Sequence, residues 1–395
     1  MKNAPSLRKM TGPPLWRDER VLRAIAQLVF LVLILAALGY FWGNMQDNMR
    51  RQGLSLSFSF LRTTSGFDIG ENLVPYSRNS TFAQAFLVGL VNTLLVSFLG
   101  VVAATLLGIF FGVARLSTNF LIQQIAKVYI EFLRNIPLLV FLIFLYTGFF
   151  IQLPRVREAI TLPGPTFLSN RGVVIPWGTP TETFDGYLWA LGGAALLGIL
   201  VTTGLNIYGR RVGRAPLSLA WGLSAFLLVA VLGWLLMPTA PLAFSRPELQ
   251  GLRIAGGLTM SPEFMALLTG LAVYTSAFIA DVVRAGIQAI PRGQVEAARS
   301  VGLSPMLTLR LIVFPQAMRV IVPPLTSQYL NLTKNSSLAV AIGYPELFHV
   351  SGTVLNQSGR AVEVITIAMA IYLAISLLTS LFMNWYNNRV RLVER

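Results

Sequence analysis

The chain has 395 residues, of which 54% are hydrophobic and only 12% are charged, and its formal net charge is +15. A soluble protein carries about 25% charged residues, so this composition excludes an ordinary soluble domain. The chain contains no cysteine and a single histidine, His349, which excludes cysteine-based metal sites, thiol nucleophiles and histidine pairs. We therefore expect neither a metal nor a cofactor.

Eight apolar segments approach or exceed the roughly 20 residues that a helix needs to cross a bilayer. In the second segment, Gly100, Gly108 and Gly112 recur at near-helical spacing, which predicts close packing against another helix. In the third, Pro137 is expected to kink or restart the helix. The predicted spans are residues 22–42, 84–113, 124–151, 187–207, 216–236, 263–288, 318–343 and 361–385. The pattern predicts an all-α, polytopic membrane bundle.

Basic residues cluster at the ends of the apolar runs, as the positive-inside rule expects, so the charge indicates a membrane protein rather than a nucleic-acid-binding one. Arg17, Arg20 and Arg23 precede the first run, and Arg389 and Arg391 follow the last. With eight spans, both termini are predicted to be cytoplasmic. Membrane lipid is an expected partner, and nucleic acid is not.

A polar segment with several helix breakers separates the sixth span from the seventh. Pro291 and Gly293 are expected to end the helix of the sixth span. Residues 294–301 are rich in good helix formers and predict a helix of about two turns. Gly302 suits a left-handed cap at the end of that helix.

A second short helix is expected directly after this cap. Ser304 suits the N-cap position and Pro305 the first helical position. The helix is expected to cover residues 306–314 and to end at Pro315. The segment therefore predicts two helices, bent at Gly302, against the inner face of the membrane.

The first of these helices offers a surface that a partner protein could accept. Ala297 and Ala298 leave it smooth, and Glu296 offers a charge to a partner cation. The alternative is an amphipathic connector lying on the bilayer surface. The spacing resembles the EAA loop of binding-protein-dependent importer permeases: Glu-Ala-Ala, three residues, Gly, nine residues, Ile, one residue, Leu, Pro. The residues in register are Glu296, Ala297, Ala298, Gly302, Ile312 and Pro315, with Phe314 in place of the leucine.

Other runs look like the polar amino acid branch of this permease family. They are Asn92-Thr93 and residues 134–139, 274–287 and 323–338, the last of which is similar to permeases of the general L-amino acid importer and of its glutamate/glutamine/aspartate/asparagine relative. The resemblance implies a type I ABC importer permease fold, with a shared core at 84–151 and 263–388. Residues 1–83 then form a cytoplasmic tail, first span and outer loop, and residues 84–388 form the transmembrane domain with a two-span insertion at 152–262.

The resemblance also implies partners and a location. The chain would be a permease subunit of an ATP-driven importer of L-amino acids in a bacterial inner membrane. It would pair with a second homologous permease chain, two cytoplasmic ATPase subunits and a periplasmic amino-acid-binding protein. The chain has no Gly-x-x-x-x-Gly-Lys-Ser/Thr phosphate loop and no paired acids or nucleophile–histidine set, so we expect no enzymatic activity of its own. The competing hypothesis is an ion-coupled carrier or channel without an ATPase.

Lys334 is the costliest residue to place in a membrane, because an unpaired charge in hydrocarbon costs several kcal/mol. One hypothesis is that it lines a translocation path and meets a substrate carboxylate. The alternatives are polar contacts that hold helices together, or a side chain that reaches to the interface. The candidate path residues are Lys334, Asn335, Ser336, Ser337, Asn92 and Thr93.

Two pairs of opposite charges are spaced three residues apart near predicted inner helix ends. Glu131 precedes Arg134, and Asp281 precedes Arg284. This spacing predicts an ion pair within each helix. The alternative is a gate whose pairs exchange between conformations.

Overall fold

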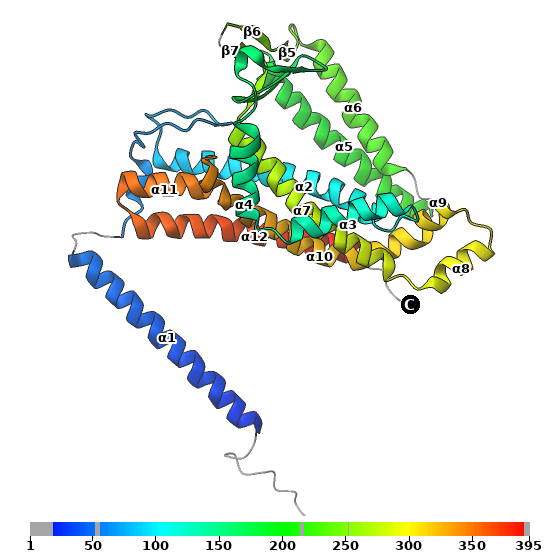
Figure 1. Ribbon diagram of the computed structural model, residues 1–395, viewed down its shortest axis with the longest axis horizontal. Coiled ribbons are helices and arrows are strands. Elements are labelled where there is room, and N and C mark those ends of the chain that lie inside the picture. Colours follow the sequence, from blue (N-terminus) through cyan, green and yellow to red (C-terminus); the bar gives the residue numbers. More distant parts are fainter. Residues whose placement is uncertain (1–18, 52–55, 214–216, 252, 391–395) are drawn as a thin grey trace, which may run out of the picture. The chain divides into compact units, whose positions relative to one another are not determined.

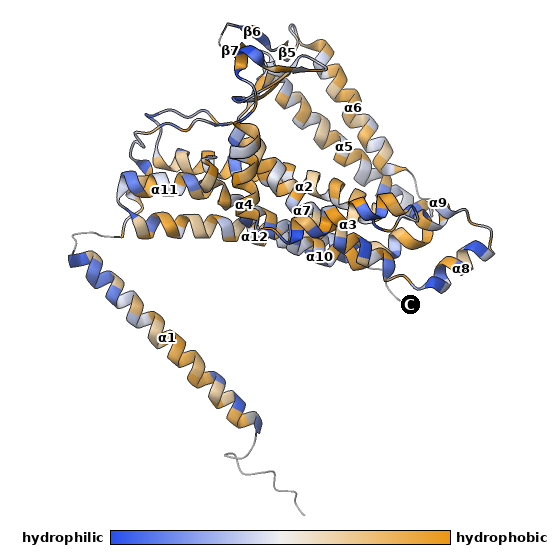
Figure 2. Ribbon diagram, in the orientation of Figure 1, coloured by the Kyte–Doolittle hydropathy of each residue, from blue (hydrophilic) through white to orange (hydrophobic). Residues whose placement is uncertain are grey.

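The computed structural model describes residues 19–51, 56–213, 217–251 and 253–390. The chain divides into two units, up to Phe60 and from Leu61 onward, which we describe separately. Most of the predicted N-terminal tail, Arg17 included, lies outside the described residues, as does Arg391. The first unit contains α1 (Glu19–Arg51), a helix with an apolar middle and polar ends (Figure 2).

The second unit is a bundle of long helices centred on α2 and α7 (Figure 1). Helix α7 packs against α2, α3 and α10, and α10 packs in turn against α12. The core lies between these helices and is built mainly from apolar side chains of α2, α4, α7 and α10. The helices of the bundle are α2 (Phe82–Ala114), α3 (Phe120–Arg134), α4 (Leu138–Ile143), α7 (Pro262–Gln288), α10 (Phe314–Asn335), α11 (Leu347–Ser358) and α12 (Ala361–Val390).

Local sequence explains why α2 starts and packs where it does. Thr81 caps its first turn, and Gln84 completes the capping box by accepting the Thr81 backbone N–H. Gly108 and Gly112 face α7 so closely that a Cβ on Gly112 would lie 2.8 Å from the carbonyl oxygen of Ala280. The expectation that glycines on this helix permit close packing is therefore confirmed.

The third span is broken, as Pro137 predicts. Helix α3 ends at Arg134, and α4 restarts after Pro137, which occupies its N-cap position. A π-helical turn, η2 (Phe144–Phe150), continues α4, and the two halves meet at an angle of 105°. Proline lacks the N–H that a continuous helix needs, which accounts for the break.

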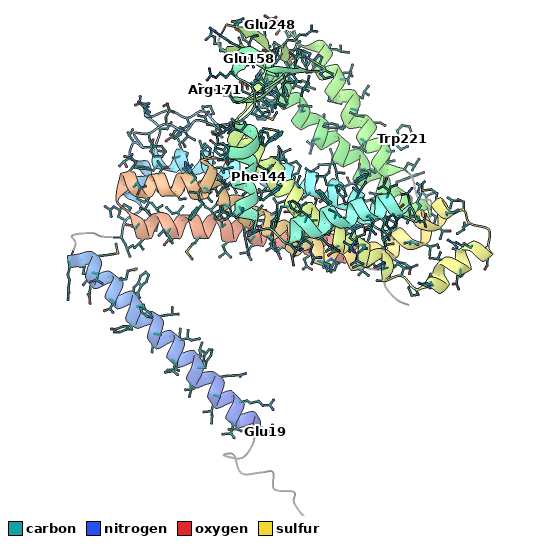
Figure 3. The ribbon with its side chains drawn as sticks, viewed as in Figure 1. Glu19, Phe144, Glu158, Arg171, Trp221 and Glu248 are labelled. Carbon is teal, nitrogen blue, oxygen red and sulfur yellow. The ribbon has the colours of Figure 1, made fainter. Side chains whose placement is uncertain are left out.

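The insertion contains a pair of apolar helices and short strands. Helices α5 (Phe184–Val212) and α6 (Ser218–Leu236) pack against each other along their length and expose apolar side chains, Trp221 among them (Figure 3). The remaining elements are η3 (Val156–Glu158), β1 (Ile160–Leu162), β2 (Thr166–Ser169), β3 (Gly172–Ile175), β4 (Trp177–Pro180), β5 (Leu242–Ser245), β6 (Glu248–Gln250), β7 (Arg253–Ala255) and β8 (Leu258–Met260).

These strands form three small antiparallel sheets, which the sequence did not indicate. One has the order β1-β2-β3-β8, and β4-β5 and β6-β7 are two-stranded ribbons. In the larger sheet Val174 pairs with Phe167 on one side and with Thr259 on the other, so residues on both sides of α5 and α6 are held together. The chain is thus helical, as predicted, with small sheets in the insertion on either side of α5 and α6.

Within the described residues, seven helices are long and apolar enough to span a membrane, and the broken third segment brings the number to eight. This agrees with the predicted count. The cytoplasmic position of both termini stays a prediction.

Candidate functional site

The segment between α7 and α10 forms two helices joined by a tight bend, as the sequence predicts. Helix α8 (Arg292–Ser300) follows Pro291, and Gly302 adopts a left-handed conformation with φ at +82°. Helix α9 (Pro305–Thr308) starts after Ser304, whose side-chain oxygen accepts the N–H of Leu307 at 3.4 Å. Helix α8 is more hydrophilic than the apolar spans (Figure 2).

The predicted end of the second helix at Pro315 is wrong. A π-helical turn, η4 (Leu309–Val313), follows α9, and the helix continues as α10 through Pro315 to Asn335. In this turn the N–H of Phe314 donates to the carbonyl of Leu309, five residues back. A proline normally collides with the carbonyl four residues before it, and the wider turn directly before Pro315 explains why the helix continues.

The docking segment, residues 292–315, presents both polar and apolar groups at its surface. Glu296 and Ala297 are exposed, whereas Ala298 is buried and faces inward. Val301 and Met306, on either side of the bend, are 76% and 72% exposed. A groove of about 220 Å³ lies between the end of α7 and these helices, lined by Ile287, Ile290, Val295, Arg299, Pro305, Thr308, Leu309 and Val313. Ile312 is half-buried beside this groove's Val313.

Charged side chains connect α2, α3 and α7 near the docking segment. Asp281 pairs with Arg284 at 3.4 Å, as predicted, and also with Arg134 of α3. Glu131 pairs with Arg115 at the end of α2, at 3.5 Å, and not with Arg134 in the described structure. Arg134 therefore joins two helices instead of pairing within its own.

Lys334 lies in the wall of a cavity of about 590 Å³ between η5 (Ser336–Ile342), α11 and α12. Ser337 lines the same cavity, and its hydroxyl donates to the carbonyl of Lys334 at 2.8 Å. Among the described residues, no carboxylate lies within ion-pair distance of Lys334. Most of the wall is apolar, with Phe348, Val364 and Met369 among its residues. The cavity thus presents one cation in a largely apolar wall.

The other candidate path residues serve the structure around this cavity. Ser336 is buried and donates to the carbonyl of Thr333 at 2.7 Å, and Asn335 is half-buried. Asn92 and Thr93 are buried and do not line the cavity of Lys334.

Asn92 and Thr93 hold the start of α11 against α2. The amide of Asn92 donates to the carbonyls of Glu71 and Pro345, both at 2.9 Å. The hydroxyl of Thr93 accepts the N–H of Leu347 at 3.0 Å. The two residues thus satisfy backbone groups at a helix end, as buried polar side chains usually do.

Glu346 was not singled out in the sequence, yet it is completely buried at the start of α11. It caps the helix by accepting the N–H groups of Phe348 and His349, and it accepts the hydroxyl of Tyr372 at 2.6 Å. Burial raises the pKa of Glu346, while these hydrogen bonds lower it. A carboxylate after Pro345 and before an apolar run is a weak sequence signal for such a cap.

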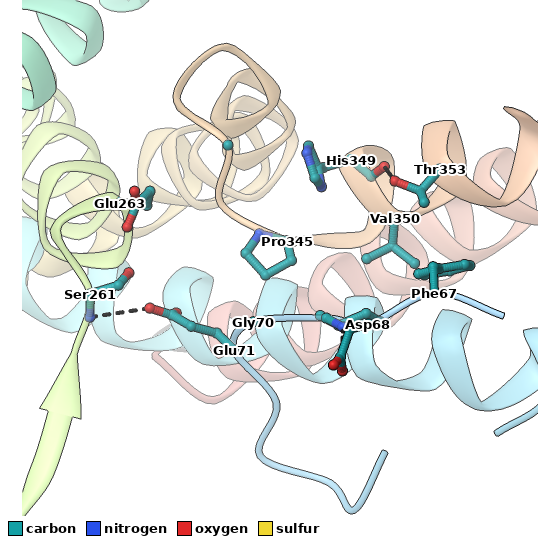
Figure 4. A pocket seen from close by; sticks show the side chains of 12 residues that line it. Phe67, Asp68, Gly70, Glu71, Ser261, Glu263, Pro345, His349, Val350 and Thr353 are labelled. Carbon is teal, nitrogen blue, oxygen red and sulfur yellow. Dashed lines mark hydrogen bonds between the residues drawn. The ribbon is translucent and has the colours of Figure 1, made fainter. Parts of the chain in front are cut away.

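A second cavity, of about 360 Å³, lies between the segment that precedes α2, the start of α7 and the first half of α11 (Figure 4). Asp68, Glu71, Glu263 and His349 line it, and Glu71 accepts the N–H of Ser261 at 3.1 Å. Burial raises the pKa of Glu71, the bonds from Ser261 lower it, and the charge of Glu263 raises it further. His349 lies on α11, and burial lowers its pKa.

Comparisons with known proteins agree with this geometry. Residues 194–392 match the family described as "Binding-protein-dependent transport system inner membrane component". The chain is 42% identical over 381 residues to the "General L-amino acid transport system permease protein AapQ" of Rhizobium johnstonii, covering 96% of this chain and 94% of the relative. It is 44% identical over 375 residues to the "Putative amino-acid ABC transporter permease protein YhdX" of Escherichia coli, covering 93% and 94%. It is 39% identical over 421 residues to the "Glutamate/glutamine/aspartate/asparagine transport system permease protein BztB" of Rhodobacter capsulatus, covering 96% of each chain.

Proposed function

The chain belongs to the family of binding-protein-dependent transport system inner membrane components, and from this premise we propose that it is the permease subunit of an ATP-driven amino acid importer. The names of its relatives support amino acids as the cargo, and the family description together with the bacterial origin of the relatives supports a bacterial inner membrane as the location. Its partners are a second homologous permease chain, two cytoplasmic ATPase subunits and a periplasmic amino-acid-binding protein. The ATPase subunits, and not this chain, hydrolyse ATP.

The docking segment carries this proposal. The residues of the Glu-Ala-Ala pattern form a bent pair of helices whose bend needs the glycine at position 302. Glu296 is exposed on this pair of helices, so its carboxylate is accessible to a cation of a partner protein. Helices α8 and α9 have few contacts with the rest of the bundle other than η4, so they can take up a displacement of the ATPase subunits. Movement of these helices would then shift α10 and alternate access to the path.

The cavity of Lys334 is the part of the path that this chain contributes. An ammonium group with no carboxylate within ion-pair distance among the described residues suits the carboxylate of an L-amino acid, and Lys334 is exposed, so a ligand in the cavity can reach it. Ser337 faces the cargo with Lys334. Ser336, Asn92 and Thr93 act from behind the wall, where their hydrogen bonds fix the segments that carry the cavity, and Asn335 follows Lys334 in sequence and is half-buried.

Charge reversal of Glu296 tests the docking step. With the tagged chain co-expressed with its partners, Glu296→Lys is expected to lose the ATPase subunits on purification and to lose amino acid uptake. Glu158→Lys is the matched control, because Glu158 is exposed on η3 in the insertion, outside the docking segment (Figure 3). It should retain both. If Glu296→Lys keeps its ATPase subunits and its uptake, the proposed docking is wrong, and uptake that persists without any ATPase would indicate a carrier or channel.

Substitution of Lys334 tests the path separately. Lys334→Met should abolish uptake while the ATPase subunits still co-purify, and Lys334→Arg should retain part of the uptake because it keeps the charge. Both variants are measured by uptake of a labelled amino acid mixture into proteoliposomes with ATP enclosed. Unchanged uptake by Lys334→Met would exclude this cavity from the path.

A further inference from the structure

A separate, polar cavity of about 270 Å³ lies where α2, α3 and α7 come together. Its lining consists entirely of basic and amide side chains: Arg115, Gln123, Gln124, Lys127, Arg284 and Gln288. Arg115 is the C-cap of α2, and Gln288 is the last residue of α7, shortly before α8. The cavity therefore lies at the same end of the bundle as the docking segment but does not share a lining residue with its groove.

The charges around this cavity leave an excess of positive charge. Arg115 pairs with Glu131 at 3.5 Å, and Arg284 pairs with Asp281 at 3.4 Å. Lys127 is exposed, and among the described residues no carboxylate lies within ion-pair distance of it. Asp281 pairs with Arg134 of α3 as well as with Arg284. The two carboxylates, of Glu131 and Asp281, are therefore outnumbered by the cations around them. The unbalanced charge suits an anion.

The three glutamines and the two arginines give this anion site many hydrogen-bond donors. An arginine presents donors in a planar fork, and an amide adds two more. A tetrahedral oxyanion such as a phosphate group accepts bonds from several directions at once, which donors on three different helices can supply. The site is therefore suited to phosphate more than to a single carboxylate.

An apolar stripe on α3 runs next to this cavity. Leu121, Ile125, Val128 and Phe132 recur at helical spacing, and each is more than half exposed. Gln124, which lines the cavity, is three residues from Leu121 and four residues from Val128, so on the helix surface it lies beside the stripe, and the stripe borders the cavity at this residue. A ligand that fills both features has a phosphate group and an apolar tail.

We propose that this cavity binds the phosphate group of an anionic phospholipid, with the acyl chains lying along the apolar stripe of α3. Basic pockets between membrane helices are suited to such head groups, and each basic residue near a membrane surface contributes about 1 kcal/mol of attraction. A free phosphate compound could bind the same donors, but it has no acyl chain to pack on the stripe. The lipid bridges α3 and the end of α7 and so steadies the helix that leads into α8.

The experiment measures lipid binding to the full chain, purified in detergent together with its co-expressed partners. Native mass spectrometry is used to titrate dioleoyl phosphatidylglycerol, with dioleoyl phosphatidylcholine as the comparison, because its choline cation balances its phosphate and leaves no net charge. Phosphatidylglycerol is expected to bind more tightly, and Lys127→Gln is expected to weaken it about fivefold, which corresponds to the loss of about 1 kcal/mol. Arg211→Gln is the matched control, because Arg211 is exposed at the end of α5 outside the cavity.

Three further results decide the proposal. Val128→Gln should weaken phosphatidylglycerol binding, since it places a polar group in the stripe, and glycerol phosphate should not displace the lipid. Displacement by glycerol phosphate, or binding that ignores Val128→Gln, would assign the site to a free phosphate compound and overturn the lipid assignment. Equal binding of the two lipids, or equal effects of Lys127→Gln and Arg211→Gln, would overturn the anion site itself. Lys127 is exposed, and no described carboxylate pairs with it, so its substitution is expected to leave the elution profile of the complex unchanged.

Discussion

Gly302 joins α8 to α9 with φ at +82°, and this backbone conformation sets the shape of the docking segment. A Cβ built on Gly302 has no heavy atom of the described chain within 4 Å, so space does not restrict the residue. The backbone does, because a residue with a Cβ pays roughly 1–2 kcal/mol in the left-handed region. Gly302→Ala should therefore loosen the bend without any steric clash.

Gly293 provides the matched control within the same segment. It lies in α8, does not have a positive φ, and its Cβ would also meet nothing within 4 Å in the described chain. Alanine is a better helix former than glycine by up to about 1 kcal/mol, so Gly293→Ala should strengthen α8. The two substitutions add the same methyl group and are expected to act in opposite directions.

Hydrogen–deuterium exchange of the α8 amides in the purified full chain measures this difference. At 25 °C the expected cost converts to amide exchange that is about five- to thirtyfold faster in Gly302→Ala, and the expected gain to exchange up to about fivefold slower in Gly293→Ala. Co-purification of the ATPase subunits should fall in the first variant only. Exchange that shifts in the same direction in both variants, or does not change in Gly302→Ala, would refute the link between the left-handed bend and the order of α8.

Three other predictions concern stability, measured by thermal unfolding in detergent. Gly112→Ala should lower the free energy of unfolding by roughly 1–3 kcal/mol, because the new Cβ would press on the backbone oxygen of Ala280. Gly100→Ala should lower it less, because its Cβ meets only a movable leucine side chain at 3.2 Å. Equal losses of stability in the two variants would contradict this reasoning. Thr93→Val should cost about 1–3 kcal/mol by leaving a buried backbone N–H without its acceptor, and a loss near zero would argue against that bond. Burial raises the pKa of Glu71 above its usual 4.5, so the native chain should lose stability as the pH rises through that raised pKa, and Glu71→Gln should not; a difference between them that stays constant with pH would contradict the assignment.

The spans and the bend were predictable because each depends on a local signal. Apolar length marks a span, Pro137 marks the break in the third one, and Ser304-Pro305 marks a helix start. Gly302 marks the bend, because few other residues adopt its conformation. These signals need no knowledge of which helices meet.

Other features could not be predicted because they depend on contacts between distant segments. The strands of the insertion have only three or four residues, too few for an alternating pattern to stand out. Helix α11 is too short to be recognised as a span. The pairing of Arg134 with Asp281 requires α3 to lie against α7, and sequence spacing favoured a partner on its own helix instead.

The candidate site also contains some features that local sequence predicts and others that it does not. Glu296, Ala297 and Gly302 could be placed from local patterns, and the structure puts them on an exposed bend. The continuation of the helix through Pro315 could not be predicted, because it depends on a π-helical turn before the proline and no residue type indicates such a turn. Lys334 was found by its cost in a membrane, but its cavity is formed with α11 and α12 and so was not visible in the sequence.

The π-helical turn before Pro315 joins α9 and α10 into one continuous helical stretch. From Pro305 to Ile342 the chain runs as one stretch of 38 helical residues, with the bend at Gly302 just before its first end and Lys334 near the other. An ideal helix of thirty residues is roughly 45 Å long. Pro323 and Pro324 lie inside α10 and remove backbone hydrogen bonds there, so a displacement of α9 reaches the Lys334 cavity along one continuous backbone that bends most easily at these two prolines.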